Sequence, residues 1–334
     1  MKKFLVIVMG IGILTSCGDD DIDTLGGIAI PPRLLSEVAP EDDQEIQEFL
    51  QTHFYNYEDF QDPIAPDFDF KIVIDTIEGD NADKTPLIDQ VEVTEIGISA
   101  FEFGLSDGEE DIIHRLYYLN AREGVGGDPS VADSVFVRYT GRLLDGRVFD
   151  GSNTGTWFDL AQIQAPAPVQ AARGFSEGVS FFNAGIIPGP DQQPNDGTFI
   201  AEGFGVGVVF MPSGLGFFNS GTGIIEAYTP LIFEVDVLTW NFADHDNDGI
   251  PSIEEDLNGN GYLYDDNTNE AGEREIQFAP LIADFQDIDD DGDGVLTRTE
   301  ISDADGNIIF PYPDSNNDDI PDYLDPDIQR DPNE

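Results

Sequence analysis

Negative charge is the feature that most constrains how this chain can fold. The sequence holds 68 Asp and Glu residues against 14 Lys and Arg residues, which gives a formal net charge of −54 at pH 7. Such a field repels nucleic-acid phosphates and anionic lipid headgroups, so nucleic acid is excluded as a partner. Hydrophobic residues still make up 40% of the chain and include 24 Phe, enough for a packed core. The length of 334 residues suggests about two folding units.

The N-terminus has the pattern of a secretory signal peptide. Two lysines precede a short apolar run over residues 4–15, which is too short to span a bilayer. The run ends in Leu-Thr-Ser-Cys, which resembles the lipobox of bacterial lipoproteins. The resemblance implies a signal peptide over residues 1–16 and acylation of Cys17; the alternative is an unmodified signal peptide with a chance cysteine. We therefore expect a lipid-anchored protein of the cell envelope, at the outer membrane, on its periplasmic face or at the cell surface.

The sequence then predicts a spacer and an extension. Residues 17–43 are acidic and contain Gly and Pro, which is typical of a flexible linker. An amphipathic helix is expected after Pro40, because acidic residues begin it and Ile46 and Leu50 follow at helical spacing. Residues 44–110 alternate strand-like runs with Asp, Gly and Asn breaks and form an N-terminal extension of unknown role.

Residues 111–240 contain a series of short motifs between strand-like runs. In chain order they are Tyr139-Thr140-Gly141, Asp145-Gly146, Phe149-Asp150, Phe158, Gly174-Phe175-Ser176-Glu177-Gly178-Val179, Met211-Pro212-Ser213-Gly214-Leu215, Gly223-Ile224-Ile225 and the run Leu231–Leu238. This order resembles that of FKBP-type peptidyl-prolyl isomerases, and several dispersed motifs in order are more specific than any one of them. The resemblance implies an α+β fold, an antiparallel sheet wrapped around a short helix that begins near Ala171.

The resemblance also implies an aromatic-walled cleft for proline-containing polypeptides. By position its residues would be Tyr139, Phe149, Asp150, Phe158, Phe175, Phe217, Ile225 and Phe233, with the Ala172 backbone amide available to a substrate carbonyl. Rotation about an Xaa-Pro bond crosses a barrier of ~18–20 kcal/mol because amide resonance is lost. A dry apolar cleft favours the twisted amide over the solvated planar one, so catalysis needs no cofactor, acid, base or metal.

Departures from the family pattern predict weak turnover. Phe175 stands where the most active members usually have Trp, and Phe217 stands where a Tyr is usual. An insertion over residues 186–205, rich in Gly, Pro, Asn and Gln, could reshape or cover the cleft. We therefore expect a folding helper with weak isomerase activity. The alternative is a non-catalytic surface lipoprotein that uses an FKBP-like domain and calcium repeats for binding or adhesion.

Residues 241–334 are strongly acidic, with 28 Asp and Glu residues against three Arg and no Lys. Twice, acidic residues occupy positions 1, 3, 5 and 12 of a calcium loop with Gly at position 6. Alternate carboxylates point inward, the Gly permits a sharp turn, and the last Glu can bind the ion with both oxygens. The two sets are Asp244, Asp246, Asp248 and Glu255, and Asp289, Asp291, Asp293 and Glu300. We expect structural Ca²⁺ here; a solvated acidic tail is the alternative.

Two further loops match this pattern less well. The third has Asp319 at the Gly position and resembles a thrombospondin type 3 repeat; its ligands would be Asp314, Asn316, Asp318 and Asp325. A fourth begins at Asp256 but ends on Asn267, which carries no charge, and we do not count it as a site. No amphipathic helix precedes the first loop, so a calcium-rigidified extracellular module is a better interpretation than paired sensor EF-hands.

The lipid anchor can be tested directly. Cys17→Ala should abolish acylation and release the protein from the membrane fraction, because we expect no other segment to be apolar and long enough to hold it there. Fractionation of cells and mass spectrometry of the N-terminus measure the two effects. Retention of the variant in the membrane fraction would contradict the lipoprotein interpretation.

Overall fold

The computed structural model describes residues 31–167, 172–195, 198–277 and 280–331. The chain divides into residues 1–32 and 33–334, and the elements below belong to the second unit. The expected signal peptide and Cys17 lie outside the described residues, as does Ala171. Among the described residues, no helix combines the length and the hydropathy that crossing a membrane requires.

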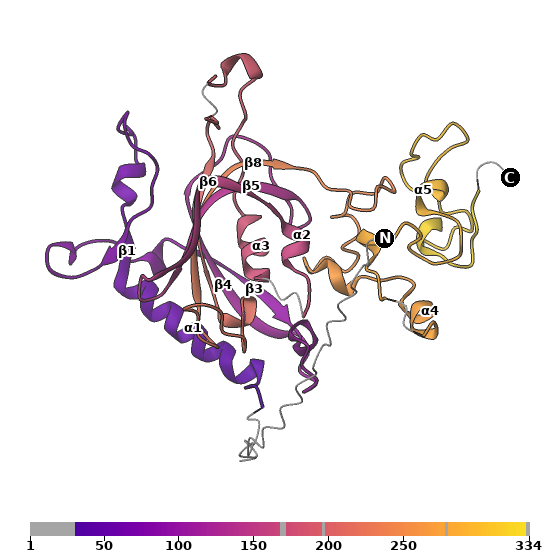
Figure 1. Cartoon of the computed structure of the whole chain (residues 1–334), viewed down its shortest axis with the longest axis horizontal. Coiled ribbons are helices and arrows are strands. Elements are labelled where there is room, and N and C mark those ends of the chain that lie inside the picture. The colour runs from indigo at the N-terminus through magenta and orange to yellow at the C-terminus, as the bar shows by residue number, and fades with distance from the viewer. Residues whose placement is uncertain (1–30, 168–171, 196–197, 278–279, 332–334) are drawn as a thin grey trace, which may run out of the picture. The chain divides into compact units, whose positions relative to one another are not determined.

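A six-stranded antiparallel sheet is the centre of this unit. Its strand order is β3-β4-β7-β8-β5-β6. The strands are β3 (Glu92–Ile98), β4 (Ile112–Arg122), β5 (Ser134–Leu143), β6 (Val148–Asp159), β7 (Gly205–Met211) and β8 (Leu231–Asn241). Two short helices, α2 (Leu160–Ile163) and α3 (Arg173–Val179), lie on one side of the sheet, and α1 (Leu35–Thr52) lies on the other (Figure 1). The expected α+β fold, an antiparallel sheet around a short helix, is confirmed.

Alternation along the strands gives the sheet two apolar faces. Val135 and Val137 of β5 face α3 and lie in the main core with Phe175. Val208 and Phe210 of β7 lie in a second core on the opposite face, which α1 covers. Because both faces of the central strands are covered, all seven residues of β7 are buried.

Two glycines let α3 approach the sheet closely. A Cβ atom at Gly178 would lie 2.5 Å from Val209 Cγ1, and one at Gly174 would lie 2.8 Å from Leu215 Cβ. Any side chain at these positions would push the helix away from its neighbours. The glycines therefore determine how closely α3, the helix that carries Phe175, packs against its neighbours.

The first helix begins earlier than the sequence predicts. α1 starts at Leu35, whereas we expected a linker up to residue 43 and a helix after Pro40. Leu35 and Val38 are buried in the main core, and the Glu109 carboxylate accepts a hydrogen bond from the Leu35 backbone N–H at 2.5 Å. Burial and this cap outweigh the helical hydrogen bond that proline cannot make. The expected linker is therefore too long at its C-terminal end.

The N-terminal extension is part of the sheet domain. β3 pairs with β4 along its whole length, so the boundary expected at residue 111 divides one sheet. A two-stranded ribbon of β1 (His53–Tyr55) and β2 (Ile74–Thr76) adds Tyr55 to the second core. The short 3-10 helices of this domain are η1 (Tyr57–Phe60), η2 (Gly79–Asn81), η3 (Leu87–Asp89), η4 (Ala100–Phe103), η5 (Pro190–Gln192) and η6 (Ser213–Leu215).

The C-terminal region consists of loops with short helices. They are η7 (Leu263–Asp265), α4 (Glu270–Glu275), η8 (Asp284–Gln286), α5 (Thr297–Glu300) and η9 (Asp322–Leu324). Leu263, Ala283 and Phe285 form a small core with Val131 and Ala161, the latter from α2. The acidic loops therefore pack on the sheet domain beside α2 and α3.

A buried carboxylate attaches α1 to the loop after β7. Asp42 is 3% exposed, and its Oδ2 atom accepts hydrogen bonds from the N–H (2.7 Å) and the hydroxyl (2.6 Å) of Ser213. Burial raises the pKa of Asp42 to about 6, although the bonds from Ser213 oppose the rise. The unfolded value is ~3.9, so the contribution of this carboxyl to stability is complete below pH ~4 and is lost as the pH rises through about 6.

Asp42→Asn should remove this pH dependence while keeping an acceptor for Ser213. The free energy of unfolding of the variant, relative to the wild type, should therefore rise between pH 4 and pH 7. Asp42→Ala should instead destabilise the protein by about 1–3 kcal/mol, because two buried donors lose their partner. Urea unfolding followed by the fluorescence of Trp157 and Trp240, both in sheet strands, measures these differences. A difference between wild type and Asp42→Asn that is constant with pH would contradict the prediction.

Candidate functional site

Four aromatic rings from four elements form one cluster. Tyr139 belongs to β5, Phe158 to β6, Phe175 to α3 and Phe233 to β8. The centroid of the Phe175 ring lies 5.1 Å from that of Phe158, 5.0 Å from Phe233 and 6.1 Å from Tyr139, at interplanar angles of 63–71°. Phe149 adds a fifth ring, 5.5 Å from Phe233. These edge-to-face contacts stabilise aromatic pairs beyond simple burial.

A polar pair lies next to the rings. The Tyr139 hydroxyl donates a hydrogen bond of 2.7 Å to Asp150 Oδ2, and Asp150 Oδ1 accepts one of 2.9 Å from the Gly151 backbone. Burial and the hydrogen bond to Asp150 raise the pKa of Tyr139 to about 12. The phenol therefore keeps its proton at neutral pH, and the Asp150 carboxylate orients it.

Seven of the eight residues predicted for the cleft lie in the main core or against it, and the eighth, Asp150, lies beside the rings. Phe175, Ile225 and Phe233 are buried in the main core, while Tyr139, Phe149, Phe158 and Phe217 are partly buried against it and Asp150 bonds to Tyr139. Ala172 is the residue that precedes α3 and is 9% exposed. The structure thus brings together a buried base, Phe175 with Phe233, and partly exposed rings around it.

The insertion over residues 186–205 packs away from this cluster where it is described. Its stem is closed by a bridge between Ile186 and Glu202. The Phe199 ring contacts the Phe136 ring at 5.4 Å. Phe136 alternates with residues of β5 that face α3, so its side chain lies on the opposite face of the sheet. The Phe199 ring of the insertion therefore packs on the face of the sheet opposite the aromatic cluster.

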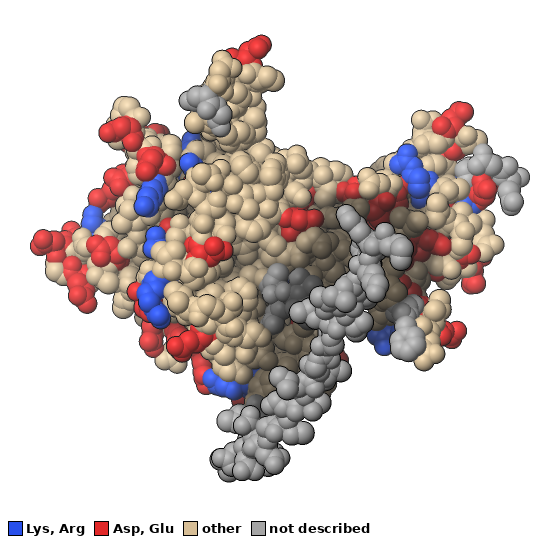
Figure 2. Space-filling model, in the orientation of Figure 1, with Lys and Arg blue, Asp and Glu red and all other residues tan. Residues whose placement is uncertain are grey.

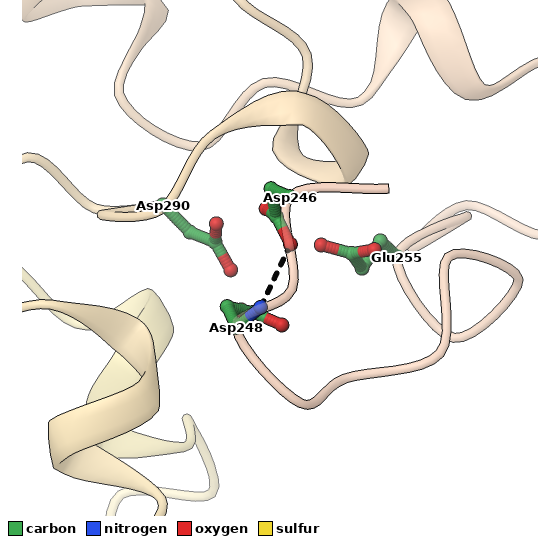
Figure 3. A group of neighbouring side chains, drawn as sticks. All are labelled: Asp246, Asp248, Glu255 and Asp290. Atoms are coloured by element: carbon green, nitrogen blue, oxygen red, sulfur yellow. Dashed lines mark hydrogen bonds between the residues drawn. The ribbon is translucent and has the colours of Figure 1, made fainter. Parts of the chain in front are cut away.

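The first acidic loop forms a cluster of carboxylates, three of them buried and Asp246 partly buried. Oxygen atoms of Asp246, Asp248, Glu255 and Asp290 all lie within 4.8 Å of one another, and the four side chains converge in Figure 3. Within the described residues, neither oxygen of Glu255 or Asp290 has a hydrogen-bond partner, and both residues are 1% exposed. Burial and the neighbouring charges raise the pKa of Glu255 to about 10 and that of Asp290 to about 11.

Asp290 was not among the predicted ligands. It holds position 2 of the second loop, where the loop pattern assigns no ligand, yet its carboxylate lies in the cluster of the first loop. Asp244, which was predicted, has a buried Oδ1 atom without a hydrogen-bond partner in the described part of the chain. No spacing within twelve residues contains the signal for Asp290, because two separate loops supply this cluster.

The second loop gathers its own carboxylates. Oxygens of Asp289, Asp291 and Asp293 lie within 4.8 Å of one another. Glu300 is fully buried, and its Oε2 atom has no hydrogen-bond partner among the described residues. Burial, with the charges of Asp291 and Asp293, raises the pKa of Glu300 to about 9. Three of the four predicted residues thus lie together, and the charges of two of them act on Glu300.

The third loop is closed by an amide. Asn316 Nδ2 donates hydrogen bonds to Asp318 Oδ2 (3.0 Å) and Asp325 Oδ2 (2.9 Å). Asp314 accepts the backbone N–H of Asp319, whose φ of 73° fits the place that Gly holds in the other loops. The four predicted residues of this loop are linked, although here an amide nitrogen lies between the carboxylates.

Acidic side chains gather on both sides of the face shown in Figure 2, over the N-terminal extension and over the C-terminal loops. The two clusters differ from this surface charge because most of their carboxylates are buried and the others are partly buried. Uncompensated buried carboxylates are costly, and oxygen atoms in this number and arrangement are the ligands that a hard divalent cation prefers.

Comparison with known proteins gives two partial matches. One curated protein, "Probable FKBP-type peptidyl-prolyl cis-trans isomerase FkpA" from Neisseria meningitidis serogroup B, is 29% identical over 138 residues, which cover 40% of this chain and 41% of that protein. The chain is similar to FKBP-type peptidyl-prolyl isomerases. The chain spans less than half the length of this curated relative. Separately, a family model described as "BamM C-terminal" matches residues 245–313, within the acidic loops.

Two solved structures are also similar. A peptidyl-prolyl cis-trans isomerase from Pseudomonas syringae pv. tomato has 24% identity and a TM-score of 0.29, over 38% of this chain and 75% of that one. FkpA from Escherichia coli has 25% identity and a TM-score of 0.29, over 38% of this chain and 48% of that one.

Proposed function

We propose that this protein is a peptidyl-prolyl cis-trans isomerase and folding helper of the cell envelope. The observation that carries the proposal is the aromatic cluster around Phe175 with the Tyr139–Asp150 pair beside it. Similarity to an FKBP-type isomerase over 138 residues supports the same activity. The substrates would be Xaa-Pro bonds in proline-containing polypeptides.

The cluster suits this reaction physically. Phe175 and Phe233 would form the apolar base for the proline ring, with Phe149 and Phe158 at its sides. An apolar site favours the twisted amide, which has lost its resonance, over the planar amide that water solvates well. The Tyr139 hydroxyl and the Asp150 carboxylate would orient the peptide through hydrogen bonds. The chain needs to move no proton, since isomerisation breaks no covalent bond.

The envelope location rests on two features. The ending of the apolar N-terminal run at Cys17 supports a lipid anchor, and the match of residues 245–313 to the BamM C-terminal model supports an association with the outer membrane. Residues 18–34 would then be the tether between the anchor and α1, which begins at Leu35.

We expect the purified chain to accelerate Xaa-Pro isomerisation weakly. Phe217→Tyr should raise kcat/KM, because the added hydroxyl supplies a hydrogen bond worth ~0.5–1.5 kcal/mol, or about 2- to 10-fold. Phe175→Trp should raise it as well by widening the apolar base. Asp150→Ala should lower it, because Tyr139 loses its orienting acceptor. A protease-coupled assay on a short Xaa-Pro peptide measures all three.

Phe199→Ala is the matched control for these variants, because it removes an aromatic ring on the opposite face of the sheet. Its activity should equal that of the wild type. If wild type and Phe217→Tyr are both folded and no faster than the uncatalysed reaction, the isomerase proposal fails. The non-catalytic binding module then takes its place, and Phe175 and Phe217 are the departures that favour it.

We also propose that the first and second acidic loops bind Ca²⁺. Within the described residues, both oxygens of Glu255 and Asp290 and the Oε2 atom of Glu300 lack a hydrogen-bond partner. This supports the proposal, because a cation would let these crowded carboxyls ionise and would replace their lost solvation. Asp290 would join the predicted ligands Asp244, Asp246, Asp248 and Glu255 around the first ion. Extracellular modules of this kind bind calcium with dissociation constants of ~10⁻⁴–10⁻³ M, which fits the calcium available outside cells.

Asp290→Asn should have opposite effects with and without calcium. Without calcium the variant should melt at a higher temperature than the wild type, because Asn avoids the cost of either burying the Asp290 charge or protonating this carboxyl on folding. With calcium it should bind the first ion about 10-fold more weakly, because a ligand has lost its charge. Scanning and titration calorimetry measure these two effects.

Asp305→Asn is the control, since it removes an exposed carboxylate from the same module. It should leave calcium affinity unchanged. Equal calcium affinities of the Asp290 and Asp305 variants would exclude Asp290 as a ligand. Identical melting of the wild type with calcium and with chelator would leave the solvated-tail interpretation.

A further inference from the structure

The loop over residues 256–266 has the same internal hydrogen bonds as the second acidic loop. The Gly261 N–H donates to Asp256 Oδ2 at 2.9 Å, as the Gly294 N–H donates to Asp289 Oδ2 at 3.1 Å. Asn260 N–H donates to Asn258 Oδ1 at 2.9 Å, and the Tyr262 N–H donates to Asn260 Oδ1 at 2.7 Å. Positions 1, 3 and 5 of this loop therefore direct their side-chain oxygens inward.

The loop closes earlier than the sequence pattern allows. η7 turns the chain at residues 263–265 and brings two carboxylates back to the loop. Asp265 accepts hydrogen bonds from Asn258 Nδ2 (3.2 Å) and Asn260 Nδ2 (2.8 Å), and Asp266 Oδ1 accepts one from Asn258 Nδ2 (3.1 Å). The acids thus stand at positions 10 and 11, before the uncharged Asn267 at position 12.

Asp266 gives an independent indication of a ligand. It is 6% exposed, so its carboxylate is almost wholly removed from water. Its Oδ1 atom faces the Asn258 amide, and its Oδ2 atom has no hydrogen-bond partner in the described part of the chain. A buried carboxylate oxygen without a partner is costly unless a cation binds it.

We propose that residues 256–266 form a third site for a hard divalent cation, with Ca²⁺ the physiological one. Its ligands are the carboxylates of Asp256, Asp265 and Asp266 and the Oδ1 atoms of Asn258 and Asn260. All are oxygen atoms, which calcium prefers, and the three carboxylates among them contribute to the affinity through their charge. When the ion binds, Asp265 and Asp266 exchange the hydrogen bonds from the Asn amide nitrogens for the ion, while the Asn Oδ1 atoms keep their inward direction.

This site lies against the helix that carries Phe175. Arg173 donates a hydrogen bond to the Asn260 backbone carbonyl at 3.3 Å, and its guanidinium lies 4.5 Å from the centre of the Tyr262 ring. The Leu263 N–H donates to Gln164 Oε1 at 3.3 Å. An ion that fixes this loop therefore fixes the contacts of α3 as well. The proposal is independent of isomerase activity.

The test counts calcium ions bound to the full chain by native mass spectrometry and titration calorimetry. Asp256→Asn combined with Asp266→Asn should bind one ion fewer than the wild type, and Asp305→Asn should bind the same number. In an Asp290→Asn background the same pair should still remove one ion, which separates this site from the first loop. Calcium should also slow amide hydrogen exchange of residues 173–179 in the wild type, and less so in the double variant.

A second variant tests the site by gain of charge. Asn258→Asp should bind one ion at least several-fold more tightly than the wild type, because it adds a carboxylate at position 3. This result supports the proposal even if the double variant fails to fold, which the fluorescence of Trp157 and Trp240 reports. Ion numbers and affinities equal to the wild type in a folded double variant, or an unchanged affinity in Asn258→Asp, would overturn it.

Discussion

The hydrogen bonds of Arg173 hold three parts of the structure together: the N-terminal extension, α3 and the acidic loops. Its guanidinium is buried and donates hydrogen bonds to Glu102 (3.3 Å), to Glu177 (3.2 Å) and to the Asn260 carbonyl (3.3 Å), while Tyr262 covers it. Burial raises the pKa of Glu177 to about 7, and the charge of Arg173 opposes the rise. Loss of one member of a buried charged group typically costs ~3–5 kcal/mol. The chain has few Lys and Arg residues, and this one arginine joins the N-terminal extension, α3 and the acidic loops.

Helix α3 is consequently held in place by contacts on several sides. Gly174 and Gly178 let it lie against the sheet, and Arg173 fixes its first turn to residues far away in sequence. Phe175 lies between these contacts, at the base of the aromatic cluster. The short helix makes few hydrogen bonds of its own, so its position depends on tertiary contacts rather than on helix propensity.

The sequence predicted those features that depend on residues close together in the chain. Strand alternation and ordered motifs located Tyr139 and Phe233, and spacing located the carboxylates of the second loop. Prediction failed where a distant residue decides the outcome. Glu109 and the main core move the start of α1 to Leu35, and Asp290 reaches a cluster whose other members lie 35 or more residues earlier. No pattern within one loop or one helix contains such information.

Three consecutive residues belong to two different clusters: Asp290 lies in the cluster of the first loop, and Asp289 and Asp291 lie in that of the second. A backbone this short cannot be ordered at one residue and free at the next, since planar peptide units link them. Under the proposed calcium assignment, an ion in either group orders the segment that the other group also uses, so the entropy of ordering is lost only once. The second ion then binds more tightly than the first. The paired loops would respond to rising calcium cooperatively, closer to a switch than to a graded buffer.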